Sequence, residues 1–204
     1  MKRALLLLPL ITGCYSFSTI GRAHTIGKGH VEAFAAPAAL VVPAPGGVAV
    51  RPVAEIGARV GVTDNVDLEG RVTSLGGSFA THIQLRRDRE AGSWEAMLAP
   101  GVAYTAPDKL AFELPIVFGV NVDKRDDQLV IAPRLAYQLR FGSPQVTSYF
   151  FTGISLGFAW RVVRHFTFMP EASLLTQLYS SPGYTSNTAG TAAFQLAAAL
   201  LFDF

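Results

Sequence analysis

Residues that could perform acid–base or nucleophilic chemistry are scarce in this chain. It contains one cysteine and four histidines among 204 residues. His82 and His165 fall on the inner side of the alternating pattern described below, and Glu171 shares a face with His165. Six residues of extended strand would separate His165 from Glu171 by roughly 20 Å at about 3.3 Å per residue. Direct proton transfer needs hydrogen-bond reach, so we predict no catalytic residues and no enzyme activity.

The sequence also indicates no metal or cofactor. A single thiol, Cys14, excludes an internal disulfide and a CxxC redox or metal site. His24 and His30 lie in a polar stretch, where we expect them to be solvated. There is no glycine-rich phosphate-binding loop. We therefore predict that the protein works without a bound metal or cofactor.

The position of Cys14 suggests covalent lipid attachment. A basic N-terminal end is followed by an apolar run of roughly ten residues, about half of what a membrane-spanning helix needs, which is typical of a secretory signal peptide. The sequence ITGC at residues 11–14 resembles the bacterial lipobox, whose cysteine sulfur receives a diacylglycerol and becomes the mature N-terminus. The resemblance implies a signal peptide over residues 1–13 and lipidation at Cys14. An ordinary signal peptide with an incidental cysteine is the alternative.

Removal of residues 1–13 would balance the charge. The chain has 17 Lys and Arg against 15 Asp and Glu, and two of the basic residues lie in the removed segment, which leaves 15 of each sign. Such a chain has no basic field to attract nucleic acid. Its mature length of about 190 residues suits one domain.

The composition points to a membrane. Half of the residues are hydrophobic, only 16% are charged, and the mean hydropathy is +0.33. No segment beyond the signal peptide approaches eighteen uninterrupted apolar residues, so a helical bundle is disfavoured. The remaining structure that satisfies its backbone hydrogen bonds within lipid is a closed β-barrel.

From residue 30 onward, hydrophobic side chains alternate with small or charged ones. This period of two is typical of barrel strands, with one face toward hydrocarbon. It predicts an all-β fold, an antiparallel up-and-down transmembrane β-barrel of about ten strands over residues 30–204, with residues 14–29 as a lipidated tether between the lipid and the first strand. The expected strands are 30–42, 50–62, 66–74, 78–86, 93–105, 109–121, 127–140, 147–160, 164–179 and 190–204.

Prolines interrupt this pattern in six of the expected strands. Each proline removes one ladder donor, so we expect bulges or strand ends at these positions: Pro37, Pro52, Pro100, Pro115, Pro133 and Pro170.

The last strand places a row of apolar residues on one face and ends on an aromatic residue. The row comprises Phe194, Leu196, Ala198, Leu200, Phe202 and Phe204. It resembles the C-terminal signature that Gram-negative outer-membrane proteins present to their insertion machinery, with Phe202 and Phe204 as the insertion signal. The resemblance implies a periplasmic C-terminus, with outer-membrane lipid and the insertion machinery as partners. An even strand number then puts the lipid of Cys14 in the periplasmic leaflet.

Charged residues of the strands are expected inside the barrel, because an arginine facing lipid near the midplane costs roughly 2–4 kcal/mol. Asp67, Arg86 and Arg140 fall on this inner face. Near-equal numbers of each sign suggest mutual pairing, since buried unpaired charges are costly. The candidate lumen charge network comprises Arg51, Glu55, Arg59, Glu69, Arg71, Glu95, Glu113, Arg134 and Glu171.

The whole chain resembles small lipobox-bearing outer-membrane barrel proteins of Gram-negative bacteria, which implies location and architecture more than activity. Eight strands enclose just enough room for side chains and sixteen or more leave a channel, so any pore through ten strands should be narrow. Three functions stay open. The favoured one is a structural or interaction barrel with a lumen closed by paired charges. The others are a narrow pore for small polar solutes and a soluble periplasmic lipoprotein whose β-sandwich binds a hydrophobic ligand. The oligomeric state is not predicted.

Overall fold

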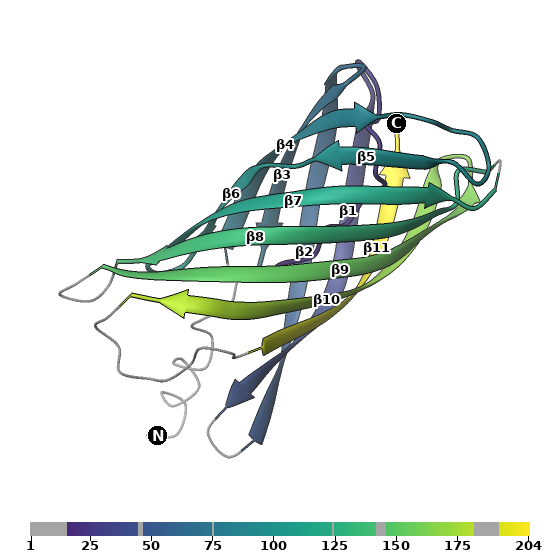
Figure 1. Ribbon diagram of the computed structural model, residues 1–204. Helices are drawn as coiled ribbons and strands as arrows, with labels where there is room; N and C mark the ends of the chain where they lie inside the picture. The colour runs from purple at the N-terminus through teal and green to yellow at the C-terminus, as the bar shows by residue number, and fades with distance from the viewer. Residues whose placement is uncertain (1–15, 45–46, 75, 124, 142–145, 182–191) are drawn as a thin grey trace, which may run out of the picture.

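A computed structural model of the chain describes residues 16–44, 47–74, 76–123, 125–141, 146–181 and 192–204. These residues form a single antiparallel sheet (Figure 1). Its strands are β1 (Val31–Ala44), β2 (Gly47–Thr63), β3 (Val66–Thr73), β4 (Gly76–Arg86), β5 (Trp94–Leu98), β6 (Gly101–Thr105), β7 (Lys109–Asn121), β8 (Gln128–Arg140), β9 (Thr147–Val163), β10 (Phe166–Ser180) and β11 (Ala192–Asp203).

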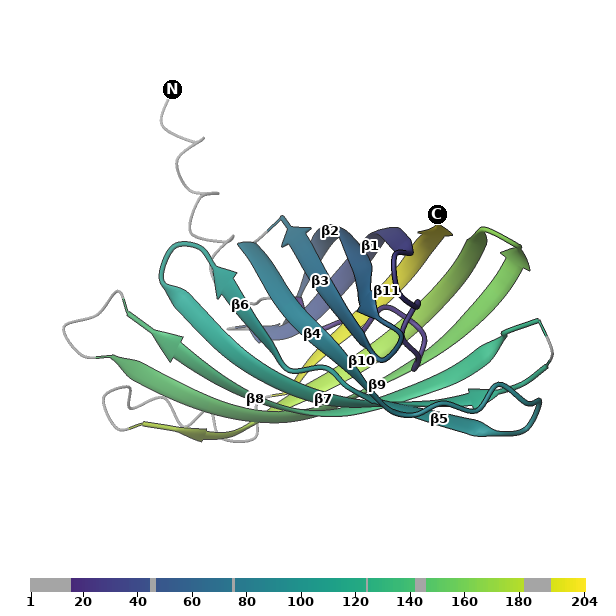
Figure 2. The ribbon, with the colours of Figure 1, turned by 90° about the horizontal axis from the view of Figure 1, so that it is seen from above.

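The sheet closes into a barrel. Apart from β5 and β6, each strand pairs with its neighbours in sequence, β1 pairs with β11, and the pairing of β3 with β4 completes the circle. Strands β5 and β6 both lie between β4 and β7, so together they occupy one strand position. The predicted fold class is therefore confirmed: this is an antiparallel up-and-down barrel with ten strand positions, seen from a second direction in Figure 2.

Only one of the six prolines interrupts a strand. Pro100 lies between β5 and β6, where its missing N–H removes a ladder bond, although its carbonyl oxygen still accepts the Thr81 N–H at 2.9 Å. The other five lie within continuous strands, so the expectation of bulges or ends is wrong for them. Register shifts occur elsewhere in the described strands, at Gly61–Thr63, Phe166–Thr167, Gln177–Tyr179 and Gln84–Arg86. Arg86 is consequently exposed, with its guanidinium 4.2 Å from the ring of Trp94, and does not face the lumen as predicted.

The exterior is apolar, as the alternation predicts. Along β7, Phe112, Leu114, Ile116 and Phe118 are all exposed, while Pro115 and Val117 between them are buried. The C-terminal row also faces outward, with Phe204 74% exposed. The surface thus has the outward apolar face of a membrane-spanning barrel.

Aromatic residues gather near both ends of the barrel. We name these ends the C-terminal mouth, where Phe204 and the turns at residues 64–65 and 164–165 lie, and the distal mouth, where the strand ends Thr73 and Gly76 and the turn at residues 106–108 lie. Trp94 and Trp160 are exposed near the C-terminal mouth, and Tyr104 and Tyr179 near the distal mouth. Two such bands are typical of barrels that span a bilayer. Among the described residues, no helix is long and apolar enough to cross a membrane.

The described chain before β1 lies inside the barrel, apart from Lys28, Gly29 and His30, which are exposed at its end. Residues 16–30, which we call the lumen segment, have no regular secondary structure, and Phe17, Ile20 and Ala23 are at most 2% exposed. The segment is the dark purple trace enclosed by strands in Figure 2. This placement differs from the tether predicted for residues 14–29. The aperiodic sequence of this segment does not distinguish an exposed tether from a buried segment. Closure of the barrel provides the interior that the segment fills.

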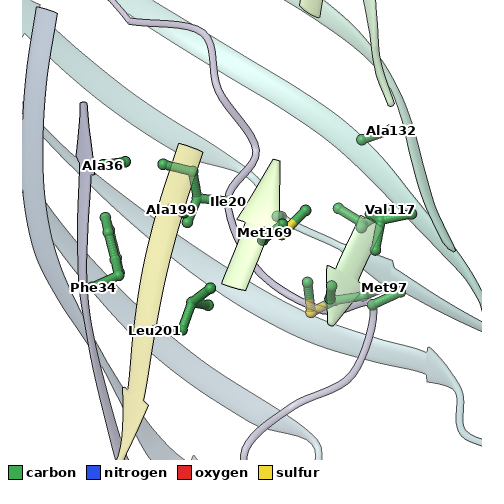
Figure 3. Packing of buried hydrophobic residues seen from close by; sticks show 13 residues of the cluster. Ile20, Phe34, Ala36, Met97, Val117, Ala132, Met169, Ala199 and Leu201 are labelled. Atoms are coloured by element: carbon green, nitrogen blue, oxygen red, sulfur yellow. The ribbon is translucent and has the colours of Figure 1, made fainter. Parts of the chain in front are cut away.

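Hydrophobic contacts fix the middle of the lumen segment. Ile20 lies among inward side chains of β1, β10 and β11, including Phe34, Met169 and Leu201 (Figure 3). Phe17 packs in a second buried cluster nearer the distal mouth, together with Leu40, Val53 and Leu175. Burying a large apolar side chain contributes about 1.5–3 kcal/mol, so these two residues anchor the segment.

Candidate functional site in the barrel lumen

The main chain of the lumen segment is hydrogen-bonded to strand side chains. The two carboxylate oxygens of Glu171 on β10 accept the N–H groups of Thr19 at 2.7 Å and Ile20 at 3.0 Å. The side-chain oxygen of Gln195 on β11 accepts the Phe17 N–H at 3.1 Å. Bonds to a charged acceptor are worth about 1.5–3 kcal/mol each, so Glu171 is the strongest single holder of this segment.

The same arrangement continues toward the C-terminal mouth with partners from three other strands. Four further donor–acceptor pairs are Gly21 N–H to Met169 Sδ at 3.2 Å, Ala23 N–H to Gln128 at 2.6 Å, Thr25 N–H to Gln84 at 2.7 Å and Ile26 N–H to Asp67 at 3.0 Å. Buried N–H groups need such partners because an unsatisfied one costs about 1–3 kcal/mol. The lumen surface therefore binds a specific main-chain path.

A dense polar cluster lies in the distal half. Arg71 donates to Glu55 at 3.0 Å, to Glu69 at 2.7 Å and to the Ser18 carbonyl oxygen at 3.0 Å. Glu55 also accepts the hydroxyls of Ser16 and Ser18. The cavity left beside this cluster holds only about 50 Å³. These residues thus fill the distal lumen with paired groups.

Two further arginines that form ion pairs border this cluster. Arg134 lies 3.5 Å from Glu113 and donates to the Thr19 hydroxyl. Arg59, 1% exposed, lies 2.7 Å from Glu32 and 3.8 Å from Asp67. Neutralisation of buried charges by close partners is what a low-dielectric interior requires.

The C-terminal mouth is built differently. Arg22 of the lumen segment pairs with Glu32 at 3.2 Å, Asp126 at 3.0 Å and Asp203 at 3.2 Å. Arg161 pairs with the same two aspartates, each at 3.0 Å. This network surrounds a cavity of about 440 Å³ that also borders Arg89, Arg164 and His165. Among the described residues, the lumen is therefore wider at this end than beside the distal cluster.

The structure brings most of the candidate network inside the barrel. Buried members are Glu55, Arg59, Glu69, Arg71, Glu95, Arg134 and Glu171, and Glu113 is half-buried. Arg51 is half-buried on β2 and makes no ion pair with any residue that the structure describes. Arg140 lies at the distal end of β8, 3.0 Å from Asp108.

The histidines and terminal residues are placed as follows. His24 is buried, with Nδ1 2.8 Å from Glu95, so the expectation that it is solvated is wrong. His165 lies exposed in the β9–β10 turn and not on the inner face. Phe202 and Phe204 face outward. Cys14 lies outside the described residues.

Sequence reasoning missed the uncharged half of the lumen. Gln84, Gln128 and Gln195 all accept bonds from the lumen segment, yet none was singled out because the search followed charge. A glutamine at an inward position of an otherwise apolar or small-residue strand was the available signal. Such an amide must find a partner when buried.

The arrangement binds the protein's own chain. No group of three or more His, Cys, Asp or Glu within the described ranges could hold a metal ion. Fold and site together define a membrane-type β-barrel, apolar outside and polar inside, with its own N-terminal chain through the lumen.

Comparisons with known proteins concern the fold. No protein-family model matches the chain, and no curated protein matches it. Among solved structures, it is similar to the translocator domain of the autotransporter NalP from Neisseria meningitidis, with 12% identity, coverage of 89% of this chain and 91% of that one, and a TM-score of 0.46. The corresponding values for Neisserial surface protein A are 13%, 86%, 96% and 0.43. For the N-terminal barrel domain of OprF from Pseudomonas aeruginosa they are 14%, 87%, 99% and 0.40.

Proposed function

We propose that this chain is an outer-membrane β-barrel of a Gram-negative bacterium, closed by its own lumen segment, with a structural or interaction role. The observation that carries the proposal is Glu171, whose two carboxylate oxygens hold the backbone of Thr19 and Ile20 across the lumen. Charge-assisted bonds of this kind are short and strong. These bonds hold the main chain of the segment in the part of the lumen that water would fill in an open pore.

The outer-membrane location is supported by the exposed apolar band, its two aromatic rims and the polar interior. We expect the folded protein to migrate faster in an unheated gel sample than in a boiled one, and to stay with membranes in carbonate. Release by carbonate without detergent would contradict the barrel proposal and support the soluble periplasmic lipoprotein.

Conductance separates a closed barrel from a narrow pore. Purified protein reconstituted in planar bilayers should give no channel events above the bilayer background, because the segment and its side chains leave only a small distal cavity. Regular single-channel steps from the unmodified protein would overturn the closed-lumen proposal and support a pore for small polar solutes.

A variant that expels the lumen segment should convert the closed barrel into a conducting one. Ile20→Asp places a second carboxylate beside Glu171, in a site lined by apolar side chains. Unpaired charge is not tolerated there, so the segment should leave and channel steps should appear. Ile20→Val keeps the apolar contact and should stay closed. Folding of both is checked by heat-modifiable migration, and deletion of residues 16–26 is the second opening variant.

Lipid attachment at Cys14 belongs to the same proposal and is supported by the ITGC sequence. The mature protein should begin at Cys14 and carry the mass of its acyl groups, which Cys14→Ser should abolish. For the predicted insertion signal, removal of Phe204 should lower the heat-modifiable fraction. An unmodified mature N-terminus elsewhere in residues 1–30 would contradict lipidation.

A further inference from the structure

The lumen segment runs from one mouth of the barrel to the other. The segment ends at the C-terminal mouth, where Gly29 N–H donates to the Gly61 carbonyl oxygen at 2.9 Å. The N–H of Val31, the first residue of β1, donates there to the Phe204 carbonyl oxygen at 3.3 Å. At the start of the segment, Ser16 borders a small cavity beside the turns of the distal mouth. The other residues of that cavity are Thr73, Gly77, Ser78, Ala103, Tyr104 and Thr105.

Two contacts with the same strand show that the segment follows this strand over much of its length. Phe17 N–H bonds Gln195, and the Arg22 guanidinium bonds Asp203, both on β11. Eight residues of strand separate the two partners, which corresponds to about 26 Å at about 3.3 Å per residue. The segment therefore covers most of the length of the lumen.

This direction limits where the N-terminal end of the mature chain can lie. Cys14 is two residues before Ser16, and an extended chain spans at most about 3.6 Å per residue. Two residues of chain therefore reach at most about 7 Å from Ser16, which is too little to lead back to the C-terminal mouth. We infer that the chain leaves the barrel at the distal mouth and presents Cys14 at the cell surface.

The assignment of the distal mouth to the cell surface rests on the proposed outer-membrane location. Bacterial barrels have short periplasmic turns and longer outer connections. Two-residue intervals between strands occur at both mouths, but the longest interval, between Ser180 and Ala192, separates two strand ends at the distal mouth. Strands β1 and β2 also extend toward the distal mouth. Their pairing continues in this direction from Ala36 with Glu55 to Ala44 with Gly47.

A lipid on Cys14 would then enter the outer leaflet and not the periplasmic leaflet. Exposed apolar side chains for it to pack against lie near the distal mouth, including Val48, Val50, Tyr104 and Tyr179. Each buried CH₂ of an acyl chain adds about 0.8 kcal/mol of membrane affinity. The anchor would thus keep the segment from sliding back through the lumen, a role that an inner-leaflet lipid on a spanning barrel would not have.

Epitope accessibility on intact cells tests this topology. The same short epitope is inserted in the full chain between Tyr15 and Ser16, between Pro107 and Asp108 at the distal mouth, and between Asp64 and Asn65 at the C-terminal mouth. Antibody should bind the first two on intact cells, and the third only after the outer membrane is permeabilised. Heat-modifiable migration confirms folding of each variant.

The outcomes separate this inference from the proposed function. Binding to the Pro107 epitope but not the Tyr15 epitope on intact cells would overturn the threaded topology and leave the barrel proposal intact. No surface binding for any of the three, together with carbonate release, would overturn the barrel proposal itself. Surface binding only at Asp64 would reverse the barrel orientation and also overturn the inference.

A single substitution tests the same topology without an inserted epitope. Tyr15→Lys creates a trypsin site before Ser16, and trypsin added to intact cells should shorten the folded protein to a chain that begins at Ser16, detected by mass. Tyr15→Ala should not be cut there. Protection of Tyr15→Lys on intact cells, with cutting only after permeabilisation, would overturn the proposal.

Discussion

The two halves of the lumen hold the same segment by different means. In the distal half, buried carboxylates such as Glu55 and Glu171 accept hydroxyl or backbone N–H groups of residues 16–20, and little empty space remains. At the C-terminal mouth, Arg161 forms partly exposed ion pairs with Asp126 and Asp203, which also pair with the buried Arg22, around a cavity of about 440 Å³. Both halves are rich in charge, but the cavity beside the C-terminal ion pairs is much larger than the one beside the distal cluster.

This difference indicates where the stability of the threaded state resides. An ion pair in a wet vestibule is screened and contributes about 0.2–1 kcal/mol. A buried charge that loses its partner costs about 3–5 kcal/mol. The distal half should therefore dominate, and substitutions at the two ends can test that ranking.

The largest effect is expected for Arg71→Ala. It leaves the buried carboxylates of Glu55 and Glu69 without their arginine, and the Ser18 carbonyl without a donor. The free energy of unfolding should fall by about 3–5 kcal/mol, measured by urea titration in detergent micelles or bilayers. Arg51→Ala is the matched control, because Arg51 makes no ion pair with the described residues. Equal losses in both variants would contradict a specific role for the distal cluster.

An intermediate effect is expected for Gly61→Ala at the C-terminal mouth. A Cβ atom there would lie 1.8 Å from the Gly27 carbonyl oxygen, a backbone atom that cannot move alone. Overpacking of this kind costs about 1–3 kcal/mol. Gly70→Ala on β3, where a Cβ meets nothing within 4 Å, should change the unfolding free energy by less than about 0.5 kcal/mol. If the two variants are equally stable, close backbone packing does not hold this end.

The smallest effect is expected for Arg161→Ala. Arg161 pairs with Asp126 and Asp203. The exposed fractions of the Arg161, Asp126 and Asp203 side chains are 28%, 19% and 23%. We expect a loss of about 0.2–1 kcal/mol at low salt that shrinks further in 1 M salt, where the screening length is about 3 Å. The measurement is the same urea titration at two salt concentrations. A salt-independent loss as large as that of Arg71→Ala would remove the distinction between the two ends.

Much of the barrel could be predicted because the alternation is a local property of each strand. Phe112, Leu114 and Phe118 face outward as the period of two requires. Arg86 was misplaced because a bulge changes the register without changing the composition. His24 was misplaced because its burial depends on Glu95, 71 residues away.

The sequence by itself determined the all-β barrel, its apolar exterior and the burial of charge, since every second side chain must match either lipid or the interior. Only the tertiary structure decided what fills that interior. An aperiodic segment carries no local signal for its environment, and its backbone N–H groups bond equally well to water or to side chains. Closure of the barrel brings Glu171, Gln195 and Gln128 from three strands around one path, and that convergence selects the threaded chain.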